Sequence, residues 1–336
     1  RHVFALSTGA MLSSGLFLLP GLAASKAGPS AILAYFIAGL LAIPAMLSVA
    51  ELSSALPKAG GAYYFLERAL GPSIGTIAGI GTWLSLVLKD AFALVGMSAY
   101  LVLILDFNGK AVALVLIAFF TFVNVLGSKV SGSIQLFLVV FVLTVMAWFL
   151  TEGLFETQKQ GIDKSNLDPF FTEGFSGLIS VIGLVFVSYG GLTKVASAAE
   201  EVDDPSLKIP LGMSLSLLVG TILYTLGALV AVALLPPDLL HEDLAPIHSA
   251  AETILPSAGV ALVVLAALAA FASAVNAGIL AAARYPMAMA RDGLFPAVAG
   301  RLSRYGTPAF GVIVTGIAIA LVVLVLDAES IAKLAS

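Results

Sequence analysis

The sequence contains no cysteine and little charge of either sign. Without cysteine, the chain can form neither disulfides nor thiolate metal sites. Charged residues make up 11% of its 336 residues, whereas soluble globular domains carry roughly 25%. The net charge is only −4 and no basic tract is present, so the chain lacks the electrostatic footprint of a nucleic-acid-binding protein. These absences exclude a disulfide framework and argue against nucleic acid as a partner.

Catalytic signatures are absent as well. The chain has three histidines, and none lies inside an apolar run long enough to span a membrane. His241 and His248 lie in a polar segment without metal-ligand spacing on one helix. No HExxH, GxSxG or phosphate-loop glycine motif occurs, although an intramembrane enzyme needs a nucleophile with a base, or metal ligands, at membrane depth. We therefore expect no enzyme, no cofactor and no metal ion.

Long apolar runs make up most of the sequence. Hydrophobic residues make up 60% of it, and the mean hydropathy is +1.07. A charge-free run of about 20 residues can span a bilayer as a helix. We therefore expect an all-α polytopic membrane protein in a lipid bilayer, with its third helix divided at Lys89 and Asp90. The runs predict nine membrane helices and the start of a tenth, at 3–25, 27–50, 72–104, 110–127, 133–151, 176–200, 209–235, 253–283, 308–326 and from 330 onward.

Polar segments separate these runs. The segment 56–68 is expected to lie in the membrane interface, and 236–256 is expected to be partly helical. A polar loop is predicted at 152–175 and a basic loop at 284–307.

Lysine and arginine counts orient the helices, because cytoplasmic loops carry an excess of both. If the amino terminus is cytoplasmic, nine of them lie inside: Arg1, Lys58, Arg68, Lys129, Lys208, Arg284, Arg291, Arg301 and Arg304. Four then lie outside: Lys26, Lys110, Lys159 and Lys164. The excess favours a cytoplasmic amino terminus.

The helix count predicts an internal repeat. Five predicted helices precede the long loop and up to five follow it, so the second half is inverted relative to the first. We divide a single transporter domain, 1–336, into repeat one (1–152), an extracellular loop (153–175) and an incomplete repeat two (176–336). The chain opens on Arg1 and stops inside an apolar segment at Ser336, so we expect a fragment truncated near the tenth helix.

Small residues interrupt the first and sixth predicted helices, at Ser13–Gly15 and at Gly190–Gly191. Each glycine costs a helix about 1 kcal/mol relative to alanine. Backbone groups freed at membrane depth need partners from protein, water or ligand. Two interrupted helices in corresponding positions of two halves indicate a secondary transporter's binding site. Close packing at helix crossings is the alternative use of such small residues.

Three charges lie within the predicted spans. Lys89 is about 25 Å along its helix, too deep for ordinary snorkelling, and ionisable residues at such depth usually face a cavity and carry function. Adjacent residues point about 100° apart on a helix, so Lys89 and Asp90 cannot pair side by side, and at least one has a partner elsewhere. Lys194, beyond the sixth-helix break, could contact substrate or pair with Glu200 or Glu201.

Four motifs carry a family resemblance. They are GAMLSSGLFLLPG at 9–21, ELSSALPKAGGAYYFLERALG at 51–71, SYGGLTKVASAAEEVDDPSLKIP at 188–210 and RYPMAMARDGLFP at 284–296. In this order they resemble the amino acid–polyamine–organocation (APC) permease superfamily, and the similarity covers essentially the whole chain. The resemblance implies a LeuT-like fold, in which two inverted five-helix repeats have helices 1 and 6 broken.

The resemblance also implies that an amino acid binds at the two breaks, since half-helix ends present amides to a carboxylate and carbonyls to an ammonium. The amides implied for the carboxylate are those of Ser14, Gly15 and Gly191. The carbonyls implied for the ammonium are those of Met11, Phe186 and Gly190. Tyr189 matches the aromatic residue that covers substrate, and Ser13 stands where the family often has glycine.

The sequence indicates the ion that would drive transport less clearly than it indicates the substrate site. Related proton-coupled permeases carry a lysine in the fifth helix in place of a sodium ion, whereas this sequence has only Val139–Val142 there. Lys89 is then the best candidate for a proton carrier or a fixed positive charge, and Asp90 and Lys194 are further coupling candidates. Ser273 and Asn276 could offer oxygens to sodium or form interhelical hydrogen bonds.

We therefore predict a secondary active amino acid transporter of the cell membrane, either proton-coupled or an exchanger. A sodium-coupled carrier of another small organic or inorganic solute is the alternative, followed by a channel. Small uncharged residues at the breaks favour a neutral amino acid, and Lys194 leaves an acidic one open. Cytoplasmic ion pairs are expected to help close the inner gate, from Glu51, Glu67, Arg68, Arg284 and Arg291.

Overall fold

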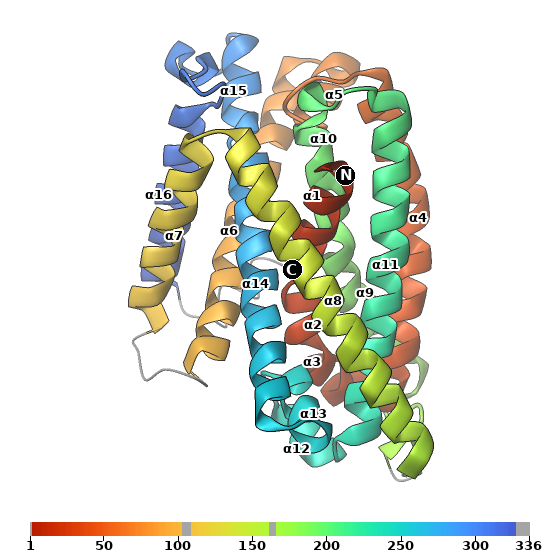
Figure 1. Cartoon of the computed structure of the whole chain (residues 1–336). Helices are drawn as coiled ribbons and strands as arrows, with labels where there is room; N and C mark the ends of the chain where they lie inside the picture. The colour runs from red at the N-terminus through yellow and green to blue at the C-terminus, as the bar shows by residue number, and fades with distance from the viewer. Residues whose placement is uncertain (1, 103–108, 161–165, 327–336) are drawn as a thin grey trace.

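The structure is a computed structural model that describes residues 2–102, 109–160 and 166–326. Within those ranges the regular secondary structure is entirely helical, which confirms the all-α prediction. Figure 1 shows the long helices side by side in one bundle, with α8 crossing the front obliquely. The predicted tenth helix lies outside the described residues.

The first predicted helix is broken, as expected. It consists of α1 (His2–Met11), the short α2 (Ser14–Phe17) and α3 (Leu19–Ala27), with the chain leaving helical geometry at Ser13. A 3₁₀ turn, η1 (Gly28–Ser30), leads into α4 (Ala31–Ala55).

The third predicted helix is not divided. After the short amphipathic α5 (Ala62–Leu70), α6 runs without interruption over Pro72–Val102. Lys89 and Asp90 interrupt the apolar run but not the helix, because both residues tolerate helical backbone and their charges face inward. The expected division at these residues is therefore wrong.

The fifth predicted helix is longer than expected. After α7 (Gly109–Val125), α8 covers Ser128–Gln160, so the first part of the predicted polar loop is helical. The range 152–160 contains no proline, and Lys159 lies 3.7 Å from Glu156 one turn earlier. The predicted loop charges at 163 and 164 lie outside the described residues.

The sixth predicted helix tightens rather than unwinds. It consists of α9 (Gly174–Tyr189), the 3₁₀ helix η3 (Gly190–Thr193), α10 (Lys194–Ser197) and the 3₁₀ turn η4 (Ala199–Glu201). Gly190 keeps helical dihedral angles, φ −61° and ψ −12°. The irregularity lies where predicted, but its form is a 3₁₀ segment.

The remaining elements follow the sequence pattern with one correction. The helices are α11 (Pro205–Leu234), α12 (Pro237–Glu242), α13 (Pro246–Ile254), α14 (Ser257–Ala282), α15 (Arg284–Arg291), η5 (Ala297–Gly300) and α16 (Ala309–Val325). Helices α12 and α13 confirm the partly helical segment. The predicted basic loop begins instead with α15, which follows α14 after a single residue.

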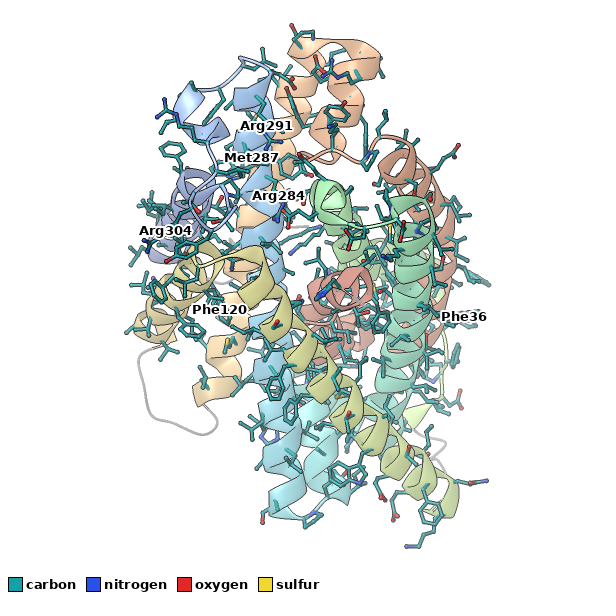
Figure 2. All side chains as sticks on the ribbon, turned by 45° about the horizontal axis from the view of Figure 1, so that its top comes forward. Phe36, Phe120, Arg284, Met287, Arg291 and Arg304 are labelled. Carbon is teal, nitrogen blue, oxygen red and sulfur yellow. The ribbon has the colours of Figure 1, made fainter. Side chains whose placement is uncertain are left out.

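Six stretches in the described residues are long and apolar enough to cross a membrane: 19–55, 72–98, 131–159, 174–197, 205–234 and 257–291. Helices α7 and α16 are shorter apolar helices. Phe36 lies at the outer edge of the bundle (Figure 2), with 45% of its surface exposed. Large apolar side chains facing outward suit contact with lipid, and the chain is a multi-pass membrane protein.

Candidate functional site

A cavity of about 460 Å³ lies where the two broken helices meet. Its wall comes from the α1–α2 break, α3, α6, α9, η3, α10 and α14. The lining residues are Ala10, Met11, Ser13, Ser14, Leu19, Leu22, Lys26, Lys89, Asp90, Phe92, Ala93, Leu184, Val187, Ser188, Gly191, Lys194 and Ala274. Leu22 and Lys26 are exposed, so the cavity reaches the surface at their end.

The structure brings about half of the predicted substrate-binding residues to this cavity. Met11, Ser13, Ser14 and Gly191 line it. The side chains of Phe186 and Tyr189 and the backbone at Gly15 and Gly190 are outside its lining. Phe186 is 39% exposed on the outer side of α9, where it faces away from the break.

Gly191 allows the two breaks to touch. A Cβ atom there would lie 2.3 Å from the carbonyl oxygen of Ala10 and 2.6 Å from the nitrogen of Met11. Both distances are far shorter than any contact between non-bonded atoms, so only glycine fits while η3 packs on the end of α1. Gly191 therefore serves both the cavity and the close packing that the sequence left as an alternative.

Two buried tyrosines hold carbonyl groups at the first break, and a third tyrosine packs behind them. The Tyr224 hydroxyl donates to the Met11 carbonyl, and the Tyr35 hydroxyl donates to Gly15 at 2.7 Å. The Tyr189 hydroxyl donates to the Tyr35 carbonyl at 2.9 Å, and its ring packs edge-on against Tyr224 at 5.1 Å. Tyr189 thus supports the first break through its contacts with Tyr35 and Tyr224 and does not line the cavity. No pattern in the sequence singled out Tyr35 or Tyr224, whose roles depend on helices far apart along the chain.

The predicted coupling residues meet at the inner end of the cavity. Lys194 Nζ lies 3.2 Å from Asp90 Oδ1 and donates to the Ala274 carbonyl at 3.5 Å. Both charged side chains are buried, and Asp90 packs so closely on Gly278 that a Cβ there would lie 1.9 Å from Oδ1. The expectation that Lys89 or Asp90 has a partner elsewhere is confirmed.

Several polar groups on the cavity wall remain open. Among the described residues, Lys89 has neither a hydrogen-bond nor an ion-pair partner, although its side chain is only partly exposed. The Ser188 hydroxyl and Asp90 Oδ2 are buried and also lack partners within the described ranges. Buried polar groups are normally satisfied, so these three groups have unused hydrogen-bonding capacity beside the cavity. The sequence did not single out Ser188, because a lone serine in an apolar helix has no distinctive pattern.

The residues considered for sodium are occupied by one another. Ser273 accepts a hydrogen bond from Gln135 at 2.8 Å, and Asn276 donates to Gln135 at 3.0 Å. Asn276 Oδ1 accepts bonds from Asn124 and Ser131, each at 3.0 Å. Gln135 also donates to the Ala5 carbonyl of α1 at 3.3 Å. Ser273 and Asn276 thus form interhelical hydrogen bonds, and these side chains join α7, α8 and α14.

Ion pairs close the opposite end of the bundle. Arg284, fully buried, binds Glu201, and Arg291 lies 2.9 Å from Glu200. Figure 2 shows both arginines along the blue helix at the end of the bundle beside the pale green α10. Glu200 also accepts the Ala59 amide at 3.2 Å, so the end of the sixth helix is tied to α15 and to the α4–α5 connection. Lys194 therefore pairs with neither glutamate.

A second group of polar contacts joins α5 to the chain after α15. Arg68 lies 3.3 Å from Glu67 and 3.7 Å from Asp292, and the Tyr63 hydroxyl donates to Asp292 at 2.8 Å. Burial, followed by this hydrogen bond, raises the pKa of Tyr63, so the phenol stays a donor. Of the five residues expected in ion pairs, four form them in the structure, Glu67, Arg68, Arg284 and Arg291, whereas Glu51 is exposed.

Comparison with known proteins gives the family. Residues 2–335 match the model of the amino acid permease family. The chain is 30% identical over its whole length to the cationic amino acid transporter 3, mitochondrial, of Arabidopsis thaliana, of which it covers 58%. It is 29% identical over 93% of its length to the branched-chain amino acid permease BcaP of Lactococcus lactis subsp. cremoris, of which it covers 72%.

The chain spans just over half the length of the first of these relatives. The Bacillus subtilis branched-chain amino acid permease BcaP is 28% identical over 89% of the chain. Membership of a permease family agrees with the expectation of a transporter rather than an enzyme. The whole-chain match and the two breaks that meet at one cavity lead to one conclusion: the chain belongs to the amino acid permease family of the APC superfamily.

Proposed function

We propose that this protein moves amino acids across a membrane by alternating access, with the cavity at the two breaks as the substrate site. One observation carries the proposal: the cavity reaches the surface at Lys26 but ends below the ion-paired layer of Arg284 and Arg291. A carrier needs such a site, open to one side and sealed from the other. The inverted repeat predicted from the helix count would allow the opposite arrangement.

The sealed end carries the arginine excess, which supports placing it in the cytoplasm together with the amino terminus. The cavity would then face outward. We retain the cell membrane as the proposed location. Labelling of an epitope tag at the amino terminus, before and after permeabilisation of intact cells, tests both the location and the orientation.

The two ends of an amino acid find complementary groups at the cavity wall. We assign the α-carboxylate to the turn at Ser13 and Ser14, where first-turn amides have no partner in their own helix. The ammonium is assigned to the Met11 side of the break.

We propose that coupling runs through the Asp90–Lys194 pair. Both groups are buried beside the substrate cavity, so a proton or a substrate charge would change their balance directly. The occupied network around Asn276 is a reason against sodium at that place. The pairing favours proton symport or exchange, and transport under imposed proton and sodium gradients in proteoliposomes tests it.

Binding to the full-length protein tests the site itself. An amino acid that binds the folded state should raise its melting temperature in proportion to RT ln(1 + [L]/Kd). Val187→Trp places an indole in the cavity wall and should abolish that rise, whereas Ile179→Trp, on the same helix but 68% exposed, should not.

Gly191→Leu would be a poorer test of the cavity, because its side chain would push α1 away from η3. If Val187→Trp were stabilised by amino acids as strongly as the unmodified protein, the assignment of the cavity would be wrong.

A further inference from the structure

We propose that the cavity selects amino acids that carry a second acidic group, with Lys89 as the residue that recognises it. The proposal rests on the proposed function and adds the class of substrate. The titratable side chains in the lining are Lys26, Lys89, Asp90 and Lys194. Three lysines against one aspartate leave a formal excess of two positive charges.

The single carboxylate in the lining is paired with Lys194. Asp90 Oδ1 lies 3.2 Å from Lys194 Nζ, and the two side chains are 1% and 4% exposed. Their charges cancel at short range, so neither contributes an open charge of full strength. Lys26 is exposed at the mouth of the cavity, where water screens it.

Lys89 is the cation that remains. It is partly buried on α6, and no described residue accepts a hydrogen bond from its ammonium or forms an ion pair with it. Its Nζ lies 2.9 Å from where a Cβ of Gly190 would be. The ammonium therefore sits against the backbone at the start of η3, directly beside Gly191 in the substrate cavity.

A cation held at membrane depth without a partner is costly, and a ligand that supplies an anion removes that cost. The proposed function already assigns the α-carboxylate to the turn at Ser13 and Ser14. A side-chain carboxylate is then the group left for Lys89. A neutral side chain would leave the ammonium unpaired, and a cationic one would be repelled by it.

The expected order of affinity is therefore glutamate or aspartate first, leucine next and arginine last. The order differs from what the names of the relatives suggest, since those proteins are called cationic or branched-chain amino acid transporters. The charge of the cavity wall, which the names do not describe, is the basis for the difference. The sequence prediction of a neutral substrate also gives way to it.

The test measures affinities of the purified full-length protein for L-glutamate, L-leucine and L-arginine, by ligand-dependent melting and by competition for uptake in proteoliposomes. Charge-assisted hydrogen bonds are worth enough to change affinity tenfold to about a hundredfold. Lys89→Met should weaken glutamate binding by that factor and change leucine binding less than about twofold. Lys89→Arg should retain most of the affinity for glutamate.

Lys208→Met is the matched control, because Lys208 is 45% exposed and pairs with Asp204 on the surface, away from the cavity. The melting temperature of each unliganded variant separates loss of binding from loss of folding. An unchanged glutamate affinity in Lys89→Met would overturn the proposal. So would an equal loss for leucine, because Lys89 would then bind the α-carboxylate common to all amino acids.

The result for the unmodified protein distinguishes the two proposals. If it binds leucine as well as or better than glutamate, the acidic preference is wrong and the transport function stands. If none of the amino acids binds, both proposals are wrong. A preference for glutamate that disappears in Lys89→Met supports both.

Discussion

Two buried polar clusters contact the same helix, α14, and differ in one respect. The first joins Asn124, Ser131, Gln135, Ser273 and Asn276 from α7, α8 and α14, and its groups bind one another. The second, the cavity cluster, contains Lys89, Asp90, Ser188 and Lys194, and several of its atoms have no partner in the described part of the chain. Both were candidate ion or substrate sites on sequence grounds.

The difference separates a structural cluster from a binding site. A closed network gains its stability from the bonds already made, so a ligand has nothing to add. An open cluster keeps a desolvation cost in the folded protein, and a ligand that satisfies it gains binding energy. Mutations in the closed network should change stability, and mutations of the open groups should change affinity.

The largest expected effect falls on the one ion pair within the cavity cluster. Asp90→Asn leaves the buried Lys194 ammonium without its carboxylate, and breaking a buried pair costs about 3–5 kcal/mol. We expect the unfolding free energy of the full-length protein to fall by that amount. The double variant Asp90→Asn/Lys194→Met should regain most of the loss, because neither member of the pair is then left charged without the other, while transport stays impaired. A double variant as unstable as the single one would mean that the pair is not what stabilises this region.

The next effect tests the closed network. Gln135→Leu removes the partner of Ser273, Asn276 and the Ala5 carbonyl, and an unsatisfied buried group costs about 1–3 kcal/mol. We expect a lower melting temperature and an amino acid affinity within about twofold of the unmodified protein. A large loss of affinity with unchanged stability would place this network in the site and would remove the distinction between the two clusters.

The smallest effect concerns the open hydroxyl. Ser188→Ala removes a buried oxygen that has no partner, so the stability of the unliganded protein should stay within about 0.5 kcal/mol or rise slightly. If the ligand uses this hydroxyl, affinity should fall severalfold. Isothermal calorimetry on the purified protein measures it. A destabilisation of 2 kcal/mol or more, on the order of a lost buried hydrogen bond, would show that the oxygen is satisfied after all.

Much of this architecture follows from the sequence because bilayer thickness and backbone chemistry restrict it. The helices lie where the charge-free runs are, and the breaks lie at Ser13 and Gly190, where small residues weaken a helix. The predictions were wrong at the end of one helix and at the charged residues of another. The helix α8 runs on to Gln160 because charged residues tolerate helix, and Lys89 and Asp90 leave α6 intact.

The composition of the site was less predictable than its position. The pairing of Lys194 with Asp90 depends on how α6 and α10 meet across α14, and one sequence carries no record of that distance. For the same reason, the contacts of Tyr35 and Tyr224 at the first break and the place of Ser188 on the cavity wall could not be predicted from the sequence. Periodicity shows which residues are buried, but only tertiary packing decides which buried polar atoms have a partner.

The most direct measurement uses the absence of cysteine from the sequence. A single cysteine introduced as Val187→Cys in the cavity wall reports occupancy through its rate of reaction with a maleimide in detergent. Leu239→Cys, 65% exposed on α12 at the same end of the bundle, is the control. The account predicts that saturating amino acid slows labelling at 187 by tenfold or more, on the order of a site occupied most of the time, and leaves 239 unchanged. Labelling at 187 that no amino acid slows would contradict the claim that substrate binds between the two broken helices.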